Sequence, residues 1–426
     1  MTYDAGERRI GRIEMNDEQT SRVHRRNLES TILVWLTKKS DQIKFDQLRN
    51  VIDYVQVFPN VETCNQYIEQ VVDEDQIYIV TDVPYVSNTR GRVYTYQNEE
   101  NFNDVIQAIQ TDHHTQMNPL GMNIFQQSSH SPLNSEFLWF QRILAVLLDS
   151  DDRDKAKENF LEAYKRYFDG NRRKEEKIQL FENTYQSCDA LQWYTRECFF
   201  FEVLNKALRT QDIDVLFSLR FFLQDMFEQL KFEYEKTSHQ IDLLAYRGQI
   251  ISSMELQTIR ENIGQLISLN SFISTTVEEE TAQGFSLSGD PSGERVFFRI
   301  KVNTTITNPK PFADISLRSQ YANEREVLFM AGSIFQINSV ILSPTVGMWI
   351  IDLQLCDDHV YELYDVYQSD RLIVSEQKSP FSFAAVLLRM NLYDKAKKYY
   401  QQLLDDGSMS GIPSVDLIVN CFLGIE

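Results

Sequence analysis

The hydrophobic periodicity of the chain changes twice, and this constrains its fold more than any other feature. Between residues 32 and 110, short apolar runs alternate with polar helical stretches, which is typical of a small parallel α/β domain. From Ser135 to about Tyr234, apolar residues recur with the helical period of 3.6 and glycine is almost absent. From Ile241 to Cys356 the chain is rich in strand-like runs. We therefore predict an α+β protein with several domains.

These changes also place the domain boundaries. We expect a tail at 1–28, a small α/β domain at 29–128, a helical lobe at 129–240, a strand-rich core at 241–370 and a helical hairpin at 371–426. The small α/β domain carries no phosphate-binding glycine motif, which favours a docking or regulatory module. The hairpin resembles one tetratricopeptide unit. Because one such unit cannot bury its own apolar face, we expect it to dock on the body of the protein or to continue a longer array, and it is a candidate site for a protein partner.

The composition excludes several kinds of partner and cofactor. The chain has 42 basic and 62 acidic residues, a formal net charge of −20 at pH 7, which argues against a nucleic-acid surface or an anionic-membrane surface. The five cysteines are scattered, and we find neither an apolar leader nor an apolar run near the ~18 residues of a membrane span. We therefore expect a cytoplasmic protein. The six histidines lack metal-binding spacing, so we expect no metal.

Two short strands in the strand-rich region stand out for the polar side chains that they carry. One apolar strand contains Arg247 and Gly248. Arginine offers a rigid fork for a phosphate or carboxylate, and glycine lets a ligand approach the backbone. A second strand places Ser274 and Thr276 on the same face. The alternative for this second segment is a threonine-rich strand that caps the acidic helix after it.

A third strand-like segment contains two glutamates, Glu324 and Glu326. In an extended strand both would lie on one face, roughly 6.5–7 Å apart along the chain. Paired carboxylates can divide their work: one faces a developing cation while the other polarises a nucleophile. The alternative is an edge strand in which these residues are ordinary surface charges.

In this order and spacing, the three segments resemble the arginine-specific mono-ADP-ribosyltransferases. That family has an Arg, then an aromatic-x-Ser-Thr-Ser strand, then Glu-x-Glu. The corresponding segments here are Arg247, 272–276 and 324–326, with Thr276 where the family has serine. The resemblance covers roughly 130–357 and implies an ADP-ribosyltransferase core of two packed β-sheets with a helical lobe.

The resemblance also implies roles for the residues that would bind NAD. Arg247 and Gly248 would hold the pyrophosphate and the nicotinamide amide. Ser274 would hold the nicotinamide ribose and position the acid, and Thr276 would support Ser274 and Glu326. Glu326 would bond the ribose 2′-hydroxyl and stabilise the oxocarbenium-like state as nicotinamide leaves.

On the acceptor side, the resemblance implies that Glu324 orients or deprotonates the target guanidinium and that Tyr321 packs on it. Phe285 would stack on the nicotinamide, and a core position suits this ring equally. The implied activity is that of an NAD(P)⁺-protein-arginine ADP-ribosyltransferase, with NAD or NADP as co-substrate and an arginine-containing protein as acceptor. Two alternatives stay open: an NAD glycohydrolase, and a non-catalytic interaction protein on a transferase scaffold.

Overall fold

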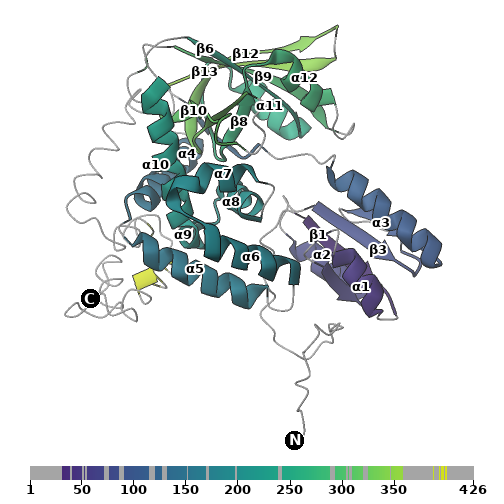
Figure 1. Cartoon of the computed structure of the whole chain (residues 1–426). Coiled ribbons are helices and arrows are strands. Elements are labelled where there is room, and N and C mark those ends of the chain that lie inside the picture. The colour runs from purple at the N-terminus through teal and green to yellow at the C-terminus, as the bar shows by residue number, and fades with distance from the viewer. Residues whose placement is uncertain are drawn as a thin grey trace, which may run out of the picture.

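The computed structural model contains a four-stranded sheet, a helical lobe and a nine-stranded sheet (Figure 1). Most of the predicted tail and C-terminal hairpin lies outside the residues that it describes, as do Tyr321 and Glu324. The described residues are 31–38, 41–49, 52, 55–71, 76–85, 91–114, 120–126, 132–150, 152–168, 172–196, 199–237, 242–287, 293–303, 306, 309–319, 325–345, 347–357, 387, 393, 395–397 and 399–400.

The first sheet is parallel, with the strand order β2-β1-β3-β4. Its central strand β1 is buried along its whole length, because one apolar cluster that includes Trp35 covers one face and a second that includes Val34 covers the other. Strands covered on both faces form continuous apolar runs, which explains the pattern in the sequence. The predicted small α/β arrangement is confirmed. Its elements are β1 Thr31–Leu36, α1 Gln42–Arg49, β2 Val55–Phe58, α2 Val61–Gln70, β3 Gln76–Thr81, β4 Arg92–Thr95 and α3 Glu99–His114.

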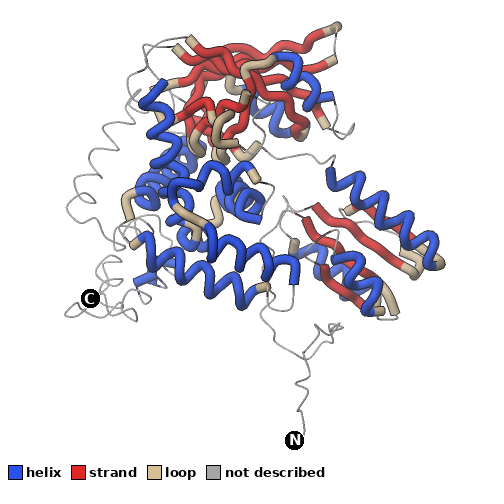
Figure 2. The backbone as a smooth tube through the Cα atoms, viewed as in Figure 1, coloured by secondary structure: helices blue, strands red, loops and turns tan. Residues whose placement is uncertain are grey.

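The helical lobe is held together by a core rich in aromatic rings. The rings of Phe181 and Phe200, for example, lie 4.1 Å apart between centroids, and both side chains are fully buried. Figure 2 shows the helices of the lobe gathered on one side of the nine-stranded sheet. The helices are α4 Pro132–Leu148, α5 Arg153–Tyr167, α6 Arg172–Thr184, η1 Ser187–Asp189, α7 Ala190–Thr195, α8 Phe199–Arg209, α9 Ile213–Ser218 and α10 Arg220–Thr237.

A few described residues near the C-terminus also belong to the core of the lobe. Leu387 and Tyr399 are buried in the same apolar cluster as the lobe helices. The Tyr399 hydroxyl donates a hydrogen bond to Asp214 on α9, 3.1 Å away, and its ring lies 4.5 Å from that of Phe217. These contacts agree with docking on the body of the protein. The tetratricopeptide resemblance itself concerns residues that lie mostly outside the described part of the chain.

The nine-stranded sheet has the order β10-β11-β8-β6-β9-β13-β12-β7-β5, and only β9 and β13 pair in parallel. A single residue pair, Tyr246 with Thr276, joins β6 to β8. The two packed sheets that we expected are therefore two halves of one curled sheet. The elements are β5 Met122–Phe125, β6 Leu243–Ile251, α11 Ser253–Glu261, β7 Leu266–Leu269, β8 Ile273–Thr276, α12 Glu279–Leu287, β9 Glu294–Val302, β10 Phe312–Asp314, β11 Glu326–Phe329, β12 Ser333–Ser343 and β13 Met348–Leu355.

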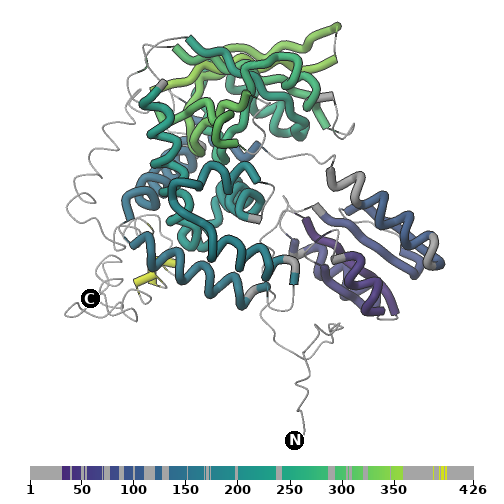
Figure 3. Tube along the Cα trace, viewed as in Figure 1, coloured from purple at the N-terminus to yellow at the C-terminus, as the bar shows by residue number. Residues whose placement is uncertain are grey.

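Strand β5 corrects one of the expected boundaries. We placed residues up to 128 in the small α/β domain, but β5 pairs with β7 at the edge of the nine-stranded sheet. Local periodicity could not reveal this, because the pairing partner lies more than a hundred residues later in the chain. The boundary therefore lies before β5. Figure 3 traces the chain from the purple four-stranded sheet into the lobe and the larger sheet.

The described part of the chain has neither a membrane-spanning helix nor a cluster of metal ligands. None of the helices described is long and apolar enough to cross a membrane. Among the same residues, no group of three or more His, Cys, Asp or Glu side chains is placed to hold a metal ion.

Candidate active site

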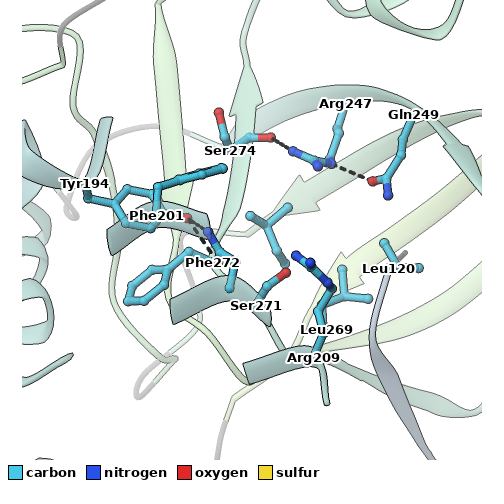
Figure 4. Close-up of a pocket in the computed structure, with 12 residues that line it drawn as sticks. Leu120, Tyr194, Phe201, Arg209, Arg247, Gln249, Leu269, Ser271, Phe272 and Ser274 are labelled. Atoms are coloured by element: carbon cyan, nitrogen blue, oxygen red, sulfur yellow. Dashed lines mark hydrogen bonds between the residues drawn. The ribbon is translucent and has the colours of Figure 1, made fainter. Parts of the chain in front are cut away.

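Three neighbouring strands bring Arg247, Ser274 and Glu326 into one hydrogen-bonded group. Strand β8 lies between β6 and β11, so Ser274 sits between the arginine and the acid. The Arg247 Nη1 donates to the Ser274 carbonyl oxygen at 2.7 Å, and the Ser274 hydroxyl donates to Glu326 Oε1 at 2.6 Å. Figure 4 shows the Arg247 side chain between Ser274 and Gln249. Residues that are 79 positions apart in the sequence thus meet at one point of the curled sheet.

The Arg247 guanidinium is held only by neutral acceptors among the described residues. Besides the Ser274 carbonyl, it donates from Nε to Gln249 Oε1 at 2.9 Å. Burial lowers the pKa of Arg247, and the like charge of Arg209 lowers it further, while Glu326 acts in the opposite direction. Because arginine normally loses its proton only above about pH 12, the group remains cationic at neutral pH. Its positive charge is therefore available to an anionic ligand.

The Glu326 carboxylate is buried, with 7% of the residue exposed, and is held by two hydroxyl groups. Ser274 donates to Oε1, and Ser319 donates to Oε2 at 2.9 Å. Thr276 is the direct partner of Glu326 across the strand pair, so Ser274 reaches the acid as its diagonal neighbour. Among the described residues, no basic side chain forms an ion pair with this carboxylate. The two serine hydroxyls nevertheless orient both carboxylate oxygens of Glu326.

A pocket of about 450 Å³, part of it open to solvent, adjoins this group. The sheet contributes Arg247, Gln249 and Ser274 to its wall, and the helical lobe contributes Tyr194 and Arg209 (Figure 4). The lobe residue Asn205 also lines the pocket. The buried Tyr194 hydroxyl and the Asn205 amide hydrogen-bond to each other, which fixes both side chains. Two arginines in one wall suit an anion such as a pyrophosphate.

Sequence reasoning assigned no site role to Tyr194, Asn205, Arg209 or Gln249. Three of them lie on lobe helices, far from the strand motifs in the sequence. No sequence signal points to Arg209, and the structure shows how it is accommodated: Gly121 has a φ of +55°, and a Cβ built on it would lie 2.6 Å from the Arg209 Cγ. Glycine at this position makes room for Arg209 beside β5.

The other predicted site residues that the structure describes are Gly248, Thr276 and Phe285. Gly248 follows Arg247 in β6 and pairs with Phe297. The Thr276 hydroxyl accepts a hydrogen bond from the Glu278 amide at 3.0 Å, in the turn before α12, which begins at Glu279. Phe285 is 54% exposed on α12 and is not part of the pocket wall, so it has neither the core position nor, in this structure, a place against the pocket.

The backbone before Glu326 departs from the expected strand. Strand β11 begins at Glu326, and Arg325 has a φ of +45°, which is unusual for a residue other than glycine. The alternation by which we placed Glu324 and Glu326 on one face therefore does not run through Arg325. Non-glycine residues in this conformation often occur at functional sites, because the local cost must be offset by the surroundings.

Comparison with known sequences agrees with this geometry. Residues 159–357 match the family model described as ADP-ribosyltransferase exoenzyme. This part of the chain is an ADP-ribosyltransferase domain. It contains Arg247, Ser274 and Glu326, and also the lobe residues that line the pocket. The activity of the domain is NAD-dependent mono-ADP-ribosyl transfer.

Solved ADP-ribosyltransferases are similar to the domain at low identity. The C3 exoenzyme of Clostridium limosum is 15% identical with a TM-score of 0.31, covering 48% of this chain and 93% of that chain. The Vis toxin of Vibrio splendidus is 18% identical with a TM-score of 0.32, covering 50% and 88%. Exoenzyme S of Pseudomonas aeruginosa is 15% identical with a TM-score of 0.30, covering 50% and 97%. No curated protein matched the chain.

Proposed function

We propose that this protein transfers ADP-ribose from NAD to an arginine guanidinium of an acceptor protein and releases nicotinamide, with NADP as a possible replacement for NAD. Mono-ADP-ribosylation follows from the family of the domain. The choice of arginine as the acceptor residue is the part that we propose. The observation that supports the site most directly is the 2.6 Å hydrogen bond from Ser274 to Glu326, beside a pocket that contains Arg247.

The pocket has the charges that a dinucleotide requires. We assign Arg247 and Arg209 to the two phosphates, because guanidinium groups bind phosphate oxygens through paired hydrogen bonds. Gln249 holds the Arg247 side chain in place through its amide oxygen. Tyr194 and the neighbouring aromatic residue Phe201 supply an apolar wall.

Glu326 is proposed to act on the nicotinamide side of the ligand. When the glycosidic bond breaks, its electron pair moves to the nicotinamide nitrogen and a positive charge develops on the ribose. A buried carboxylate that is already oriented stabilises this charge without reorganisation. Ser274 keeps Glu326 in that orientation. The guanidine nitrogen then forms the new bond to the ribose carbon.

Glu324 and Tyr321 are proposed to act on the acceptor side. An arginine side chain has a pKa above about 12, so one proton must be removed as the new carbon–nitrogen bond forms. Glu324 is two residues before Glu326 and is the nearest carboxylate in the sequence that could take this proton. Tyr321 would hold the plane of the acceptor guanidinium by stacking.

The test uses labelled NAD, with agmatine as a small guanidino acceptor. We expect the wild-type protein to label agmatine. We expect Glu324→Gln to release nicotinamide at near the wild-type rate while agmatine labelling is lost. Repeating the assay with NADP tests the second co-substrate.

Two results would contradict the arginine assignment. Nicotinamide release without any labelled agmatine or labelled protein would identify an NAD glycohydrolase. Undiminished labelling by Glu324→Gln would remove this residue from the acceptor side.

A further inference from the structure

We propose that Ser319 is a positioning residue for Glu326, which it holds from the side opposite Ser274. The inference rests on the proposed function, because it takes Glu326 as the acid that faces the ribose. Its starting observation is the pair of hydrogen bonds on the carboxylate: Ser274 donates to Oε1 at 2.6 Å, and Ser319 donates to Oε2 at 2.9 Å. The motif predicts the first contact. The second comes from outside the three motif segments.

Ser319 is placed by a turn that is tied to the backbone of Glu326 itself. The Ile315 amide donates to the Glu326 carbonyl oxygen at 2.8 Å, and the Ile315 side chain is fully buried. The Ile315 carbonyl oxygen in turn accepts hydrogen bonds from the amides of Arg318 and Ser319, both at 2.7 Å. The turn therefore starts at the acid residue and returns to it. Its geometry fixes the distance between the serine hydroxyl and the carboxylate.

The same turn is anchored to the helical lobe on its outer side. Arg318 forms an ion pair with Glu233 on α10, with Nε and Oε1 3.3 Å apart. The residue before it, Leu317, is 99% exposed. Lobe and sheet thus both hold the segment that carries Ser319. A hydroxyl supported from two sides can orient a carboxylate more firmly than one on a free loop.

A second hydrogen bond matters because of the way a glutamate rotates. The terminal torsion of its side chain has a broad energy minimum, so one hydrogen bond leaves the plane of the carboxylate free to swing. Two donors on opposite oxygens fix the plane. Each carboxylate oxygen can accept two hydrogen bonds, so Oε2 can still accept one from a ribose hydroxyl while Ser319 stays bound. Ser319 therefore orients the acid without competing with the ligand.

The experiment compares four single variants with the wild-type chain by nicotinamide release from NAD. Ser319→Ala removes the hydroxyl, Ser319→Cys keeps its approximate size but is a weak donor, and Ser319→Thr retains the donor. Ser316→Ala is the matched control. It lies in the same turn, and its hydroxyl donates to Asp314, at 2.5 Å, instead of to Glu326.

We expect Ser319→Ala and Ser319→Cys to lower kcat about tenfold, the scale of one hydrogen bond to a charged group, with KM for NAD changed by less than about twofold. Ser319→Thr should restore most of the rate, and Ser316→Ala should match wild type. If Ser319→Ala does not fold, Ser319→Cys carries the same test.

Thermal denaturation separates positioning from a general effect on folding. Ser319→Ala and Ser319→Cys should melt at about the same temperature as Ser316→Ala while their kcat falls. A loss of kcat shared by Ser316→Ala would overturn the proposal.

Glu326→Gln, measured in parallel, distinguishes two kinds of failure. If Glu326→Gln retains the wild-type rate, the proposed function fails. If Glu326→Gln is inactive while Ser319→Ala keeps the wild-type kcat, the proposed function stands and the positioning role of Ser319 is wrong.

Discussion

Two polar groups that are both largely buried hold their charges in opposite ways. In the helical lobe, Arg220 and Asp152 pair directly: Nε lies 2.9 Å from Oδ1, and Nη2 lies 2.5 Å from Oδ2. In the candidate active site, the described partners of Arg247 are a carbonyl and an amide oxygen, and those of Glu326 are two hydroxyls. The lobe joins its opposite charges, whereas the site keeps them apart.

This difference indicates which of the two charged groups is suited to binding a ligand. A bidentate arginine–carboxylate pair satisfies itself and has no need of a third component. A half-buried cation and a buried anion that are held only by neutral partners keep most of their field. NAD offers an anionic pyrophosphate and, during reaction, a developing cation, so it complements both. The site gives up the stability that direct pairing would provide, and gains charges oriented for chemistry.

The largest effect should come from removing the negative charge of the site. Glu326→Gln keeps the size of the side chain, and we expect nicotinamide release to fall by about 10² to 10³, the scale of losing one preorganised electrostatic partner. The melting temperature should hardly change, because no ion pair to Glu326 is lost. Both quantities are measured on one preparation, by a release assay and by thermal denaturation. If Glu326→Gln instead lowers the melting temperature strongly, Glu326 belongs to a structural network like that of the lobe.

The next largest effect should come from the lobe, and it should be a loss of stability. Asp152→Ala leaves Arg220, whose side chain is 5% exposed, without its carboxylate partner. We expect the free energy of unfolding to fall by about 3 kcal/mol, as when one member of a buried pair is removed. Urea denaturation followed by tryptophan fluorescence measures this, and the activity of the folded fraction should be unchanged.

A surface pair serves as the control for this variant. Arg172 and Glu176 are 91% and 65% exposed, so Glu176→Ala should change stability by no more than about 0.5 kcal/mol. If Asp152→Ala instead lowers activity at constant stability, the contrast between lobe and site is not valid.

The smallest effect should be the pH dependence of the stability that the Asp152–Arg220 pair contributes. Burial raises the pKa of Asp152, but the hydrogen bond and the charge of Arg220 outweigh it and hold the pKa below its usual value. A carboxyl whose pKa is lower in the folded state stabilises the protein above its unfolded pKa of about 3.9, and this contribution is lost as the pH falls below that value. The stability difference between wild type and Asp152→Ala should therefore be constant at neutral pH and shrink below about pH 4. A difference that grows on acidification would contradict this.

Much of the fold and part of the site could be predicted from local sequence alone. The apolar run 32–36 indicates a doubly covered strand, and β1 is buried along its length. The motif segments around Arg247, Ser274 and Glu326 predict a shared site, and the structure joins them by hydrogen bonds. Such features can be predicted because periodicity and short spacing are properties of the chain near each residue.

Other features depend on contacts between distant segments and could not be predicted without the folded structure. Strand β5 pairs with β7 across more than a hundred residues, the side chain of Arg209 enters the pocket beside Gly121, and Ser319 reaches Glu326 through a closed turn. No local pattern marks any of these residues, because each acquires its role from what packs against it. Local sequence was enough to predict the types of secondary structure and the chemistry of the motif. The curl of the sheet and the docking of the lobe decided which further side chains surround that motif.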